Sequence, residues 1–496
     1  MSELPKGWRG TLLNGVVDKI VGGGTPSKSV PSYYEGDIPW MTVKDMNKSY
    51  LTDTIDHITQ EAIDNSSTNV IPAGTPIIAT RMSLGKIVRA SFDSAINQDL
   101  KALFVNREVD NYYFEYWYRS QGLKIESLGT GTTVKGVRLE VINALEFPLA
   151  PLAEQKRIVE KLDEVLAQVD TIKAHLDGIP ALLKRFRQSV LASAVSGKLT
   201  EEWRRENSDY STASMLDSFQ ELPKPARYNS RSTSFIQGVC ATAVGKPVHK
   251  VVESWDWVPL VSIAKMESGH TPSRSKPEYW GGSVKWIGIK DARKNHANTI
   301  SETEQRTNEL GLANSASRLL PKDTICISRT ASVGYVVKMG EPMATSQDFV
   351  NWVPSEVVYP DWLKWLFVAE KESLFKFGRG STHTTVYFPE WLALHISLPP
   401  LQEQKEIVRL VDQYFAFADT IEAQVKKAQA RVDNLTQSIL VKAFRGELVP
   451  QDPNDEPADK LLERIAQARK EAEALAKAAK KAEAAKKKAE KAAAKG

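Results

Sequence analysis

A glycine-rich stretch near the N-terminus is the part of this 496-residue sequence that most resembles a nucleotide-binding motif. It reads Gly22-Gly23-Gly24-Thr25-Pro26-Ser27-Lys28-Ser29. A phosphate-binding loop needs a glycine directly before the lysine and a helix that starts there, so that backbone N–H groups surround the phosphate. Here Ser27 precedes Lys28 and Pro26 removes one N–H, while the related stretch later in the chain has Arg274 in place of Lys28. The stretch therefore does not predict nucleotide binding.

Other catalytic chemistries lack their residues as well. A methyltransferase acting on amino groups of nucleic acids would need an Asn/Asp-Pro-Pro-aromatic loop and a glycine-rich cofactor loop after a strand, and the sequence contains neither. Its seven histidines form no His-x-x-x-His pair and no acid-flanked metal cluster. We expect a chain that is not an enzyme on its own and that holds no cofactor or metal.

The sequence does contain three kinds of polar loop, each present twice. The first copies are residues 25–29, 81–86 and 130–135, and the second copies are residues 271–275, 329–332 and 379–384. They combine glycine with Ser or Thr and a cation, and such loops can approach phosphates and base edges. The alternative is that they are ordinary turns, because Gly, Ser and Thr favour turns anyway. Trp40 and Trp286 lie near the first loop of each copy, and core anchoring is favoured over base stacking for both. The candidate DNA-contacting residues are Thr25, Ser27, Lys28, Lys44, Arg81, Ser83, Lys86, Gln98, Thr130, Thr132, Thr133, Lys135, Thr271, Ser273, Arg274, Lys290, Arg329, Ser332, Gln347, Arg379, Ser381, Thr382 and His383.

Two long stretches of nearly the same sequence must position these loops. They match without a gap for about 48 residues at an offset of 249. Apolar residues recur every three or four positions along both, which is typical of one face of a helix. Gly197 and Gly446 suit the left-handed position after the last turn, and Glu154 and Glu403 suit the first turn, where a negative charge meets the helix dipole. The stretches begin with Pro151-Leu152-Ala153-Glu154-Gln155-Lys156 and Pro400-Leu401-Gln402-Glu403-Gln404-Lys405, and proline suits a first helical position.

Each of these helices would span roughly 70 Å at 1.5 Å per residue. So long an apolar stripe needs a partner, and the obvious partner is the other copy. Gly178-Ile179-Pro180 is expected to break or kink the first helix, whereas Lys427-Ala428-Gln429 lets the second run on.

The globular stretches before the two helices are also related. Thr25–Tyr33 matches Thr271–Tyr279 at an offset of 246, and Gln98-Asp99 matches Gln347-Asp348. A repeat with the period of a whole domain indicates tandem duplication and not a solenoid.

The globular copies share framework positions and differ elsewhere. Thr42 becomes Gly288, and Asn97 becomes Ser346. We interpret this pattern as two modules on one scaffold that recognise different ligands.

The pattern of short β-type runs, turns and helices predicts a mixed α/β (α+β) protein with more than one domain. Residues 111–124 are expected to be helical, and residues 76–80 and 86–88 are expected to be strands. The expected segments are a first globular domain at 1–150, a long helix at 151–199, a polar linker with one short helix at 200–250, a second globular domain at 251–398, a second long helix at 399–447 and a tail at 448–496.

The tail from Ala458 is rich in Ala, Lys and Glu. It carries 12 Lys or Arg and 6 Asp or Glu, a surplus of +6, so the remaining body carries about −2 of the overall +4. Such a composition favours helix but supplies almost no core, which predicts a solvated or frayed helix. Non-specific attraction to phosphates is the alternative. Any basic surface in the body must be local.

The two cysteines, Cys240 and Cys326, give neither a disulfide framework nor a zinc-binding spacing. No run of 18 apolar residues exists, and Met1–Lys6 does not resemble a signal peptide. We therefore expect a cytoplasmic protein that does not associate with membranes.

Taken together, these features resemble the DNA specificity subunit (S, or HsdS) of type I restriction–modification systems. The resemblance rests on the duplicated domain–helix layout, the Pro-Leu-x-Glu-Gln-Lys helix starts and the Gly-x-Thr-Pro-Ser and Gln-Asp motifs, and it covers the chain to about residue 450. Segments 166–170, 183–188 and 443–448 resemble the enterobacterial K-type branch in particular.

The resemblance implies that each globular domain is a target recognition domain reading one half of a split DNA sequence. The two helices would form an antiparallel coiled coil that holds the domains at a fixed distance. Two methyltransferase subunits using S-adenosylmethionine and two ATP- and Mg²⁺-dependent motor–nuclease subunits would complete the complex. All catalytic residues would then lie in those partners.

Two other functions fit the same pattern. The helices could assemble proteins while the globular domains bind peptides, or the chain could be a stand-alone DNA-binding regulator with two modules. Apolar helix stripes serve all three functions equally well.

Overall fold

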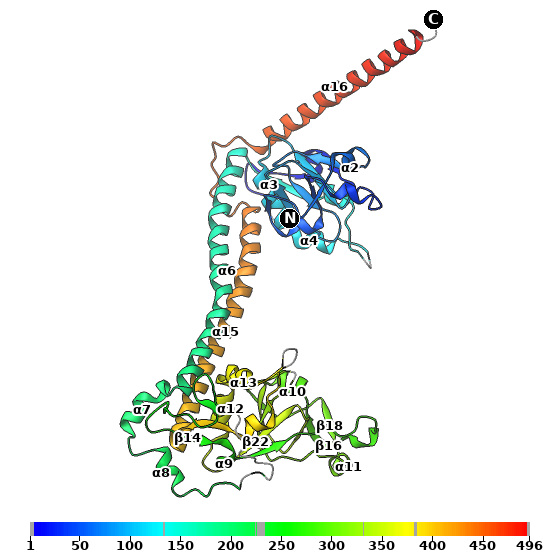
Figure 1. The fold of residues 1–496 in the computed structure, drawn as a ribbon. Helices are drawn as coiled ribbons and strands as arrows, with labels where there is room; N and C mark the ends of the chain where they lie inside the picture. The colour runs from blue at the N-terminus through cyan, green and yellow to red at the C-terminus, as the bar shows by residue number, and fades with distance from the viewer. Residues whose placement is uncertain are drawn as a thin grey trace. The chain divides into compact units, whose positions relative to one another are not determined.

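Contacts divide the chain into two units, each of which is described separately below. The computed structural model describes residues 4–131, 134–223, 225, 234–330, 332–380 and 384–493. The first unit joins Met1–Asp177 to Lys427–Gly496, and the second unit is Gly178–Lys426. The long helices α6 (Leu152–Val195) and α15 (Leu401–Ala443) each contribute one part to each unit (Figure 1). The first unit is therefore assembled from segments that lie far apart in the sequence.

The first unit contains three sheets. Its strands are β1 Arg9–Leu12, β2 Val17–Gly22, β3 Ile38–Met41, β4 Tyr50–Leu51, β5 Asp56–Ile58, β6 Asn69–Ile71, β7 Ile77–Ala79, β8 Ile87–Ala90, β9 Ser94–Ile96, β10 Leu100–Val105 and β11 Glu146–Leu149. The sheets have the orders β2-β10-β7-β8-β4, β5-β3-β9-β6 and β1-β11. The strands expected at 76–80 and 86–88 are present as β7 and β8.

Helices complete the first unit and cover its aromatic core. They are α1 Leu13–Val16, η1 Pro31–Tyr34, η2 Val43–Asn47, α2 Gln60–Asp64, α3 Asn111–Ser120, α4 Gly122–Ser127, α5 Leu139–Asn143 and α16 Ala458–Ala493. The helix expected at 111–124 is thus two helices, α3 and α4. Trp117 and Phe147 are fully buried, with ring centroids 4.7 Å apart.

The second unit repeats this organisation. Its strands are β12 Ile236–Gln237, β13 Thr242–Val244, β14 Asp256–Pro259, β15 Ala264–Ser268, β16 Trp280–Ile287, β17 Thr299–Ile300, β18 Gln305–Thr307, β19 Ile325–Ser328, β20 Val336–Met339, β21 Ala344–Thr345, β22 Phe349–Pro354 and β23 Leu394–Leu398. The sheet orders are β15-β22-β19-β20-β17, β18-β16-β21 and β12-β13-β23-β14.

Short helices connect and flank the strands of the second unit, as they do in the first unit. They are η3 Lys198–Thr200, α7 Glu201–Glu206, α8 Thr212–Leu216, α9 Leu260–Ile263, η4 Pro277–Tyr279, α10 Ile289–Lys294, α11 Glu309–Ala313, α12 Pro360–Ala369, α13 Lys371–Phe377 and α14 Phe388–Leu392. Both units have a five-stranded mixed sheet with its helices, so the expected α+β class and the tandem duplication are confirmed.

The two long helices run antiparallel within each unit. In the first unit Lys173 Nζ lies 2.7 Å from Asp433 Oδ1, and Gln429 Nε2 donates to Asp177 Oδ1 at 2.6 Å. Partner numbers fall along α15 as they rise along α6, which is the antiparallel sense. In the second unit Arg187 Nη2 lies 2.5 Å from Asp419 Oδ1. The expected pairing of the two helices is confirmed.

Of the break or kink expected at Gly178-Ile179-Pro180, the break does not occur, because α6 continues through Pro180, and the kink stays a prediction. The left-handed ends are confirmed: φ is +76° at Gly197 and +74° at Gly446.

Replacing Gly178 with alanine is expected to stabilise α6 by about 0.5–1 kcal/mol, because glycine is entropically unfavourable inside a helix. A Cβ at this position would meet nothing within 4 Å. Amide hydrogen exchange around residue 178 measures the effect. Gly197→Ala is the matched control at the end of the same helix. It should destabilise the protein, since its φ is left-handed and its Cβ would overlap Val252. Faster exchange in Gly178→Ala would contradict the expectation.

The Glu-Gln pair at the start of each long helix is buried and joins the helix to its unit. In the first unit Glu154 Oε2 accepts from Trp8 Nε1 at 2.9 Å. Gln155 accepts from the Asp110 N–H at 2.8 Å and donates to the Ala150 carbonyl at 2.8 Å. These contacts give the glutamates a role beyond the expected interaction with the helix dipole, and the sequence pattern did not predict it.

The second unit uses the same pair with an additional cation. Glu403 Oε2 accepts from Trp255 Nε1 at 2.8 Å, and Oε1 accepts from Thr200 at 2.7 Å and from Arg204 Nη1 at 2.5 Å. Glu403 is fully buried, so these donors replace its water. Gln404 accepts from the Tyr359 N–H at 2.7 Å.

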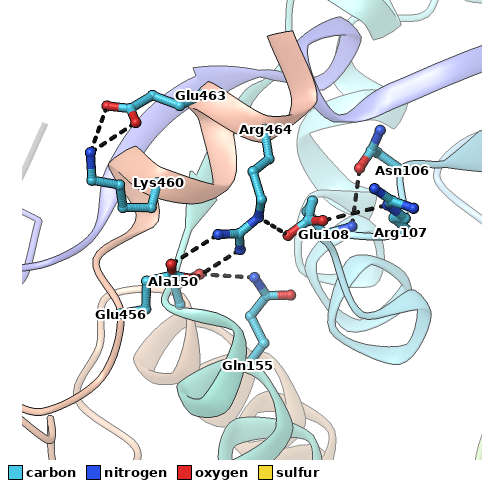
Figure 2. Close-up of polar contacts among 9 residues, drawn as sticks. All are labelled: Asn106, Arg107, Glu108, Ala150, Gln155, Glu456, Lys460, Glu463 and Arg464. Atoms are coloured by element: carbon cyan, nitrogen blue, oxygen red, sulfur yellow. Dashed lines mark hydrogen bonds and ion pairs between the residues drawn. The ribbon is translucent and has the colours of Figure 1, made fainter. Parts of the chain in front are cut away.

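The expectation that the tail supplies almost no core is wrong for its first two turns. Ala458, Leu461 and Ile465 are at most 2% exposed and belong to the core of the first unit. Arg464 lies between Glu108, whose Oε2 accepts from Nε at 2.7 Å, and Glu456, whose carboxylate accepts from both Nη atoms at 2.8 and 2.9 Å (Figure 2). The beginning of α16 is therefore part of the first globular domain.

The expected linker at 200–250 also contributes ordered structure. Strands β12 and β13 join the sheet of β23 and β14. The buried carboxylate of Glu370 holds this segment, because it accepts from the N–H groups of Cys240 and Ala241 at 2.9 and 2.8 Å and from Thr242 Oγ1 at 2.8 Å. The short helix expected near 214–220 lies at Thr212–Leu216 as α8.

Candidate nucleic-acid interface

The Gly-x-Thr-Pro-Ser loop and the Gln-Asp loop meet in both units. Thr25 Oγ1 donates to Gln98 Oε1 in the first unit, and Thr271 Oγ1 donates to Gln347 Oε1 in the second. The loops approach so closely that a Cβ on Gly23 would overlap the carbonyl oxygen of Ile96. Both motifs therefore form one loop pair, and this pair is the common frame of the candidate interface.

A Lys-Asp pair, Lys44-Asp45 in the first unit and Lys290-Asp291 in the second, holds a third segment beside this frame. In the first unit Asp45 Oδ2 accepts from the Thr42 N–H at 2.8 Å, and Oδ1 accepts from the Ile55 N–H at 2.9 Å. In the second unit Asp291 makes the same two contacts, with the N–H groups of Gly288 at 2.9 Å and Glu304 at 2.8 Å. The aspartate is a positioning residue, and the lysine before it is exposed.

Four candidate residues of the first unit line a single hollow of about 540 Å³. Lys44 Nζ lies 2.8 Å from Asp56 Oδ2 at its edge. This hydrogen bond raises the pKa of Lys44, so the amine stays charged at neutral pH. The lining residues are Thr25, Lys28, Tyr34, Trp40, Thr42, Val43, Lys44, Asp56, Asn97, Gln98 and Asp99.

Arg81 and Thr130 line a second hollow of about 400 Å³ in the same unit, together with Arg138. Thr130 and Gly136 exchange backbone hydrogen bonds of 2.8 and 2.9 Å that close the loop between them. Arg81 Nη1 lies 3.8 Å from Asp99 Oδ1, and Asp99 also lines the first hollow. The two hollows are therefore neighbours.

The other described candidates of the first unit, Ser27, Ser83, Lys86 and Lys135, are not among the lining residues of these hollows. Ser27 Oγ is 2.7 Å from Ser29 Oγ, and Lys86 Nζ donates to Asn47 Oδ1 at 3.0 Å. The Lys135 carbonyl accepts from the Met82 N–H at 3.1 Å, and the Ser83 N–H donates to the Arg81 carbonyl at 2.7 Å. Thr132 and Thr133 lie outside the described residues.

In the second unit the exposed candidates include Ser273, which pairs with Ser275 at 2.9 Å, and Lys290, which lies on α10. Arg379 Nη2 lies 2.9 Å from Glu390 Oε1, and Ser332 is half-buried. Ser381, Thr382 and His383 lie outside the described residues.

Arg81 and Arg329 begin the corresponding candidate loops 81–86 and 329–332, but they do not occupy equivalent positions. The Arg329 N–H donates to the Asp348 carbonyl at 2.8 Å, and it is Thr80 that makes the equivalent 2.8 Å bond to Asp99. The Arg329 guanidinium is half-buried over the Phe388 ring, with its Cζ 4.5 Å from the centroid. Arg329 is therefore a weaker candidate than Arg81.

The two substitutions cited above as marks of different ligands fall on buried supports. Asn97 and Ser346 are 6% and 2% exposed, and each accepts from the N–H of the aspartate two residues later, at 3.1 and 3.3 Å. Thr42 is 5% exposed and caps the segment of Asp45, as Gly288 does for Asp291. These pairs preserve the frame, and Thr42 and Asn97 also line the first hollow, so the two exchanges do not by themselves indicate different ligands.

A difference between the copies at a position that is not buried lies elsewhere, and the sequence did not predict it. Asp56 of β5 and Gln305 of β18 are equivalent, since each pairs in register with the tryptophan of the neighbouring strand, Trp40 or Trp286. The offset between the copies rises by three residues between the tryptophans and these two positions. Once this shift is allowed for, the sequence alone matches Asp56 with Gln305. Trp40 and Trp286 are 6% and 3% exposed, which agrees with their expected role as core anchors.

The side chains of this interface are hydrogen-bond donors, acceptors and cations and not a catalytic group. Among the described residues, no three His, Cys, Asp or Glu side chains are grouped so as to hold a metal ion. Burial and the neighbouring Glu370 raise the pKa of Cys240 to about 11, and burial raises the pKa of Cys326 further. In the part of the chain that the structure describes, no helix combines the length and apolarity needed to cross a membrane.

Sequence comparison finds one family model that matches both halves of the chain. The family described as "Type I restriction modification DNA specificity domain" matches residues 5–181 and again residues 252–429. The EcoKI specificity subunit of Escherichia coli, a type I restriction enzyme subunit, is 32% identical over 358 residues, which are 70% of this chain and 68% of that protein. The EcoDI specificity subunit of Escherichia coli is 29% identical over 486 residues, which cover 94% of this chain and 96% of that protein.

Solved structures share the fold. The HsdS subunit from Thermoanaerobacter tengcongensis superposes with a TM-score of 0.55 at 19% identity, covering 90% of this chain and 98% of that one. A chain from a study of complex assembly and conformational transition of the type I R-M system gives a TM-score of 0.60 at 18% identity, covering 90% of this chain and 100% of that one.

Proposed function

This chain belongs to the type I restriction–modification DNA specificity family, and from that premise we propose that each of its two units reads one half of a split DNA target. It would act as the non-catalytic, cytoplasmic specificity subunit of its complex. The loop pair of each unit would contact base edges, while surrounding lysines and hydroxyls would contact phosphates and fix the register.

One observation carries this proposal: the same frame is built twice, with different exposed side chains around it. The hydrogen bond from the threonine of the first loop to the glutamine of the Gln-Asp loop recurs in both units. The hydrogen bonds by which Asp45 and Asp291 hold the neighbouring segment recur as well. The exposed neighbours differ, as in Lys28 against Arg274 and Asp56 against Gln305. The same loop framework in both units, with different side chains around it, supports two DNA-recognition domains that share a fold and differ in specificity.

The helices would set the spacing between the half-sites and dock two methyltransferase subunits. Readers on one face of B-DNA favour half-site centres about one helical turn, roughly 34 Å, apart. S-adenosylmethionine would bind the methyltransferase subunits, and ATP and Mg²⁺ would bind two motor–nuclease subunits. Because the body carries about −2, we propose that the partners supply part of the electrostatic attraction to DNA.

The proposal is tested by mapping N6-methyladenine across the genome of a host that expresses this chain with its methyltransferase subunit. A chimera carries residues 255–397 from another member of the family. We expect a split motif in the unmodified strain and a change in only one half of it in the chimera, because each domain reads its own half-site.

Unchanged methylation by a folded chimeric complex would contradict the proposal and favour the alternative in which the second domain binds protein. Tight split-site binding by this chain without methyltransferase subunits would instead favour a stand-alone regulator. A footprint with an unprotected spacer, dependent on those subunits, supports the proposal over both.

A further inference from the structure

Arg274 of the second unit is held in place although it is exposed. Its Cζ lies 5.3 Å from the ring centroid of Trp280 and 5.6 Å from that of Trp286. The two rings are nearly perpendicular, at 87°, and their centroids are 5.2 Å apart. Each indole N–H is bonded to the backbone of the same loop, Trp280 to the Ser273 carbonyl at 3.3 Å and Trp286 to the His270 carbonyl at 3.1 Å. The guanidinium therefore lies against a fixed aromatic corner.

Gln305 holds the same guanidinium from the side. Arg274 Nη2 donates to Gln305 Oε1 at 3.3 Å. Gln305 is placed by its strand, because in β18 it lies in register with Trp286 of β16. The contacts with both rings and with this amide limit the rotamers of an otherwise flexible side chain. Binding a ligand therefore costs Arg274 less side-chain conformational entropy than it would cost a free arginine.

The equivalent place in the first unit has different chemistry. Lys28 stands where Arg274 stands, Tyr34 where Trp280 stands, and Asp56 where Gln305 stands. Asp56 pairs with Lys44 at 2.8 Å, and the Lys28 ammonium has no hydrogen-bond or ion-pair partner among the residues that the structure describes. Among the described residues, the first unit therefore presents an exposed amine without a partner at this point, and the second unit presents a planar guanidinium held by three side chains.

We propose that Arg274 reads guanine at one base pair of the half-site bound by the second unit, with Gln305 as its positioning residue. This inference rests on the proposed function. A guanidinium matches the O6 and N7 acceptors of guanine in the major groove, and this is the commonest specific contact of arginine. A phosphate can also accept two parallel hydrogen bonds from a guanidinium. The two ligands differ in their consequence, because a base contact sets the preference at one position whereas a phosphate contact strengthens binding to all sequences alike.

The test uses the full chain assembled with its methyltransferase subunits. Once the motif of the unmodified complex is mapped, each position of the second unit's half-site is varied to all four bases, and binding is measured at several salt concentrations. Arg274→Lys keeps the charge but removes the fork. We expect it to lower the preference for guanine at one position by roughly 5- to 150-fold, the range for a bidentate pair, with the salt dependence unchanged.

Arg306→Lys is the matched control, because Arg306 follows Gln305 in the same strand and pairs with Glu302 at 3.0 Å. It should leave all positions unchanged. Gln305→Leu should weaken the guanine preference, and Gln305→Glu, which keeps an acceptor for Arg274, should retain most of it. A purely structural role for Gln305 would instead change affinity equally for every sequence.

Two outcomes would overturn the inference. In one, Arg274→Lys leaves the preference at every G·C pair of the half-site unchanged. Alternatively, Arg274→Ala could weaken binding equally for all sequences and reduce the salt slope by about 1, which marks a phosphate contact. A domain exchange that still changes one half of the motif would leave the proposed function standing in each case.

Discussion

Replacing Glu403 with alanine is expected to lower the stability of the second unit by about 3–5 kcal/mol, the range for removing one partner of a buried ion pair. Glu403 is fully buried, and the Arg204 side chain is only 18% exposed. The substitution leaves that cation, the Thr200 hydroxyl and the Trp255 indole N–H without their shared acceptor. Hydrogen exchange of the second unit in the full chain measures the loss, because it resolves the two units separately.

Glu406→Ala is the control for this prediction. Glu406 lies three residues further along α15 and pairs with Arg409 at 2.7 Å, but the Arg409 side chain is 59% exposed. A surface pair of this kind contributes about 1 kcal/mol or less. Equal effects of the two substitutions would show that Glu403 is not the central contact between the helix and its domain. Glu403→Gln, which retains an acceptor for Trp255, should fall between them.

Replacing Leu461 with alanine is expected to destabilise the first unit by about 2–5 kcal/mol, as for other fully buried leucines. Leu461 is completely buried although it belongs to the Lys- and Ala-rich tail. Its loss would open a cavity beneath the first turns of α16, where Arg464 also contacts Glu108 at 2.7 Å. The change is measured as faster hydrogen exchange in the first unit.

Leu475→Ala in the same helix is the matched control, because the Leu475 side chain is 71% exposed. It should change stability by less than about 0.5 kcal/mol, as surface substitutions usually do. If both leucines behaved alike, the first turns of α16 would not be part of the domain. An effect confined to α16 itself, with the sheets of the first unit protected as before, would lead to the same conclusion.

The long helices and the duplication were predictable because their signals are long and regular. An apolar period maintained over about 48 residues outweighs a single Gly-Ile-Pro interruption, so α6 forms through Pro180. The tail was misjudged because its composition was averaged over its whole length. Ala458, Leu461 and Ile465 have helical spacing, and this short apolar face was the signal that could have placed them in the core.

The candidate interface was predictable as a set of loops but not as an arrangement. Thr25 and Gln98 are 73 residues apart, and no local pattern indicates that their side chains meet. The exchanges at Asn97 and Thr42 were interpreted as signs of different ligands, because a substitution between copies does not reveal whether the position is buried. Asp56 and Gln305 were missed because the repeat shifts by three residues before them, so that they match at an offset of 249 and not at the 246 of the preceding motifs.

The division of the first unit between the two ends of the chain has a consequence for protein synthesis. Its N-terminal part leaves the ribosome first, but its remaining core residues in α15 and α16 follow only after the second unit, Gly178–Lys426. At about 5–20 residues per second, the roughly 250 intervening residues take about 12–50 s to translate. The second unit is a continuous segment and can fold as it emerges. The nascent first domain meanwhile exposes the apolar surface that α15 and α16 later cover, and this surface is available to chaperones until those helices emerge.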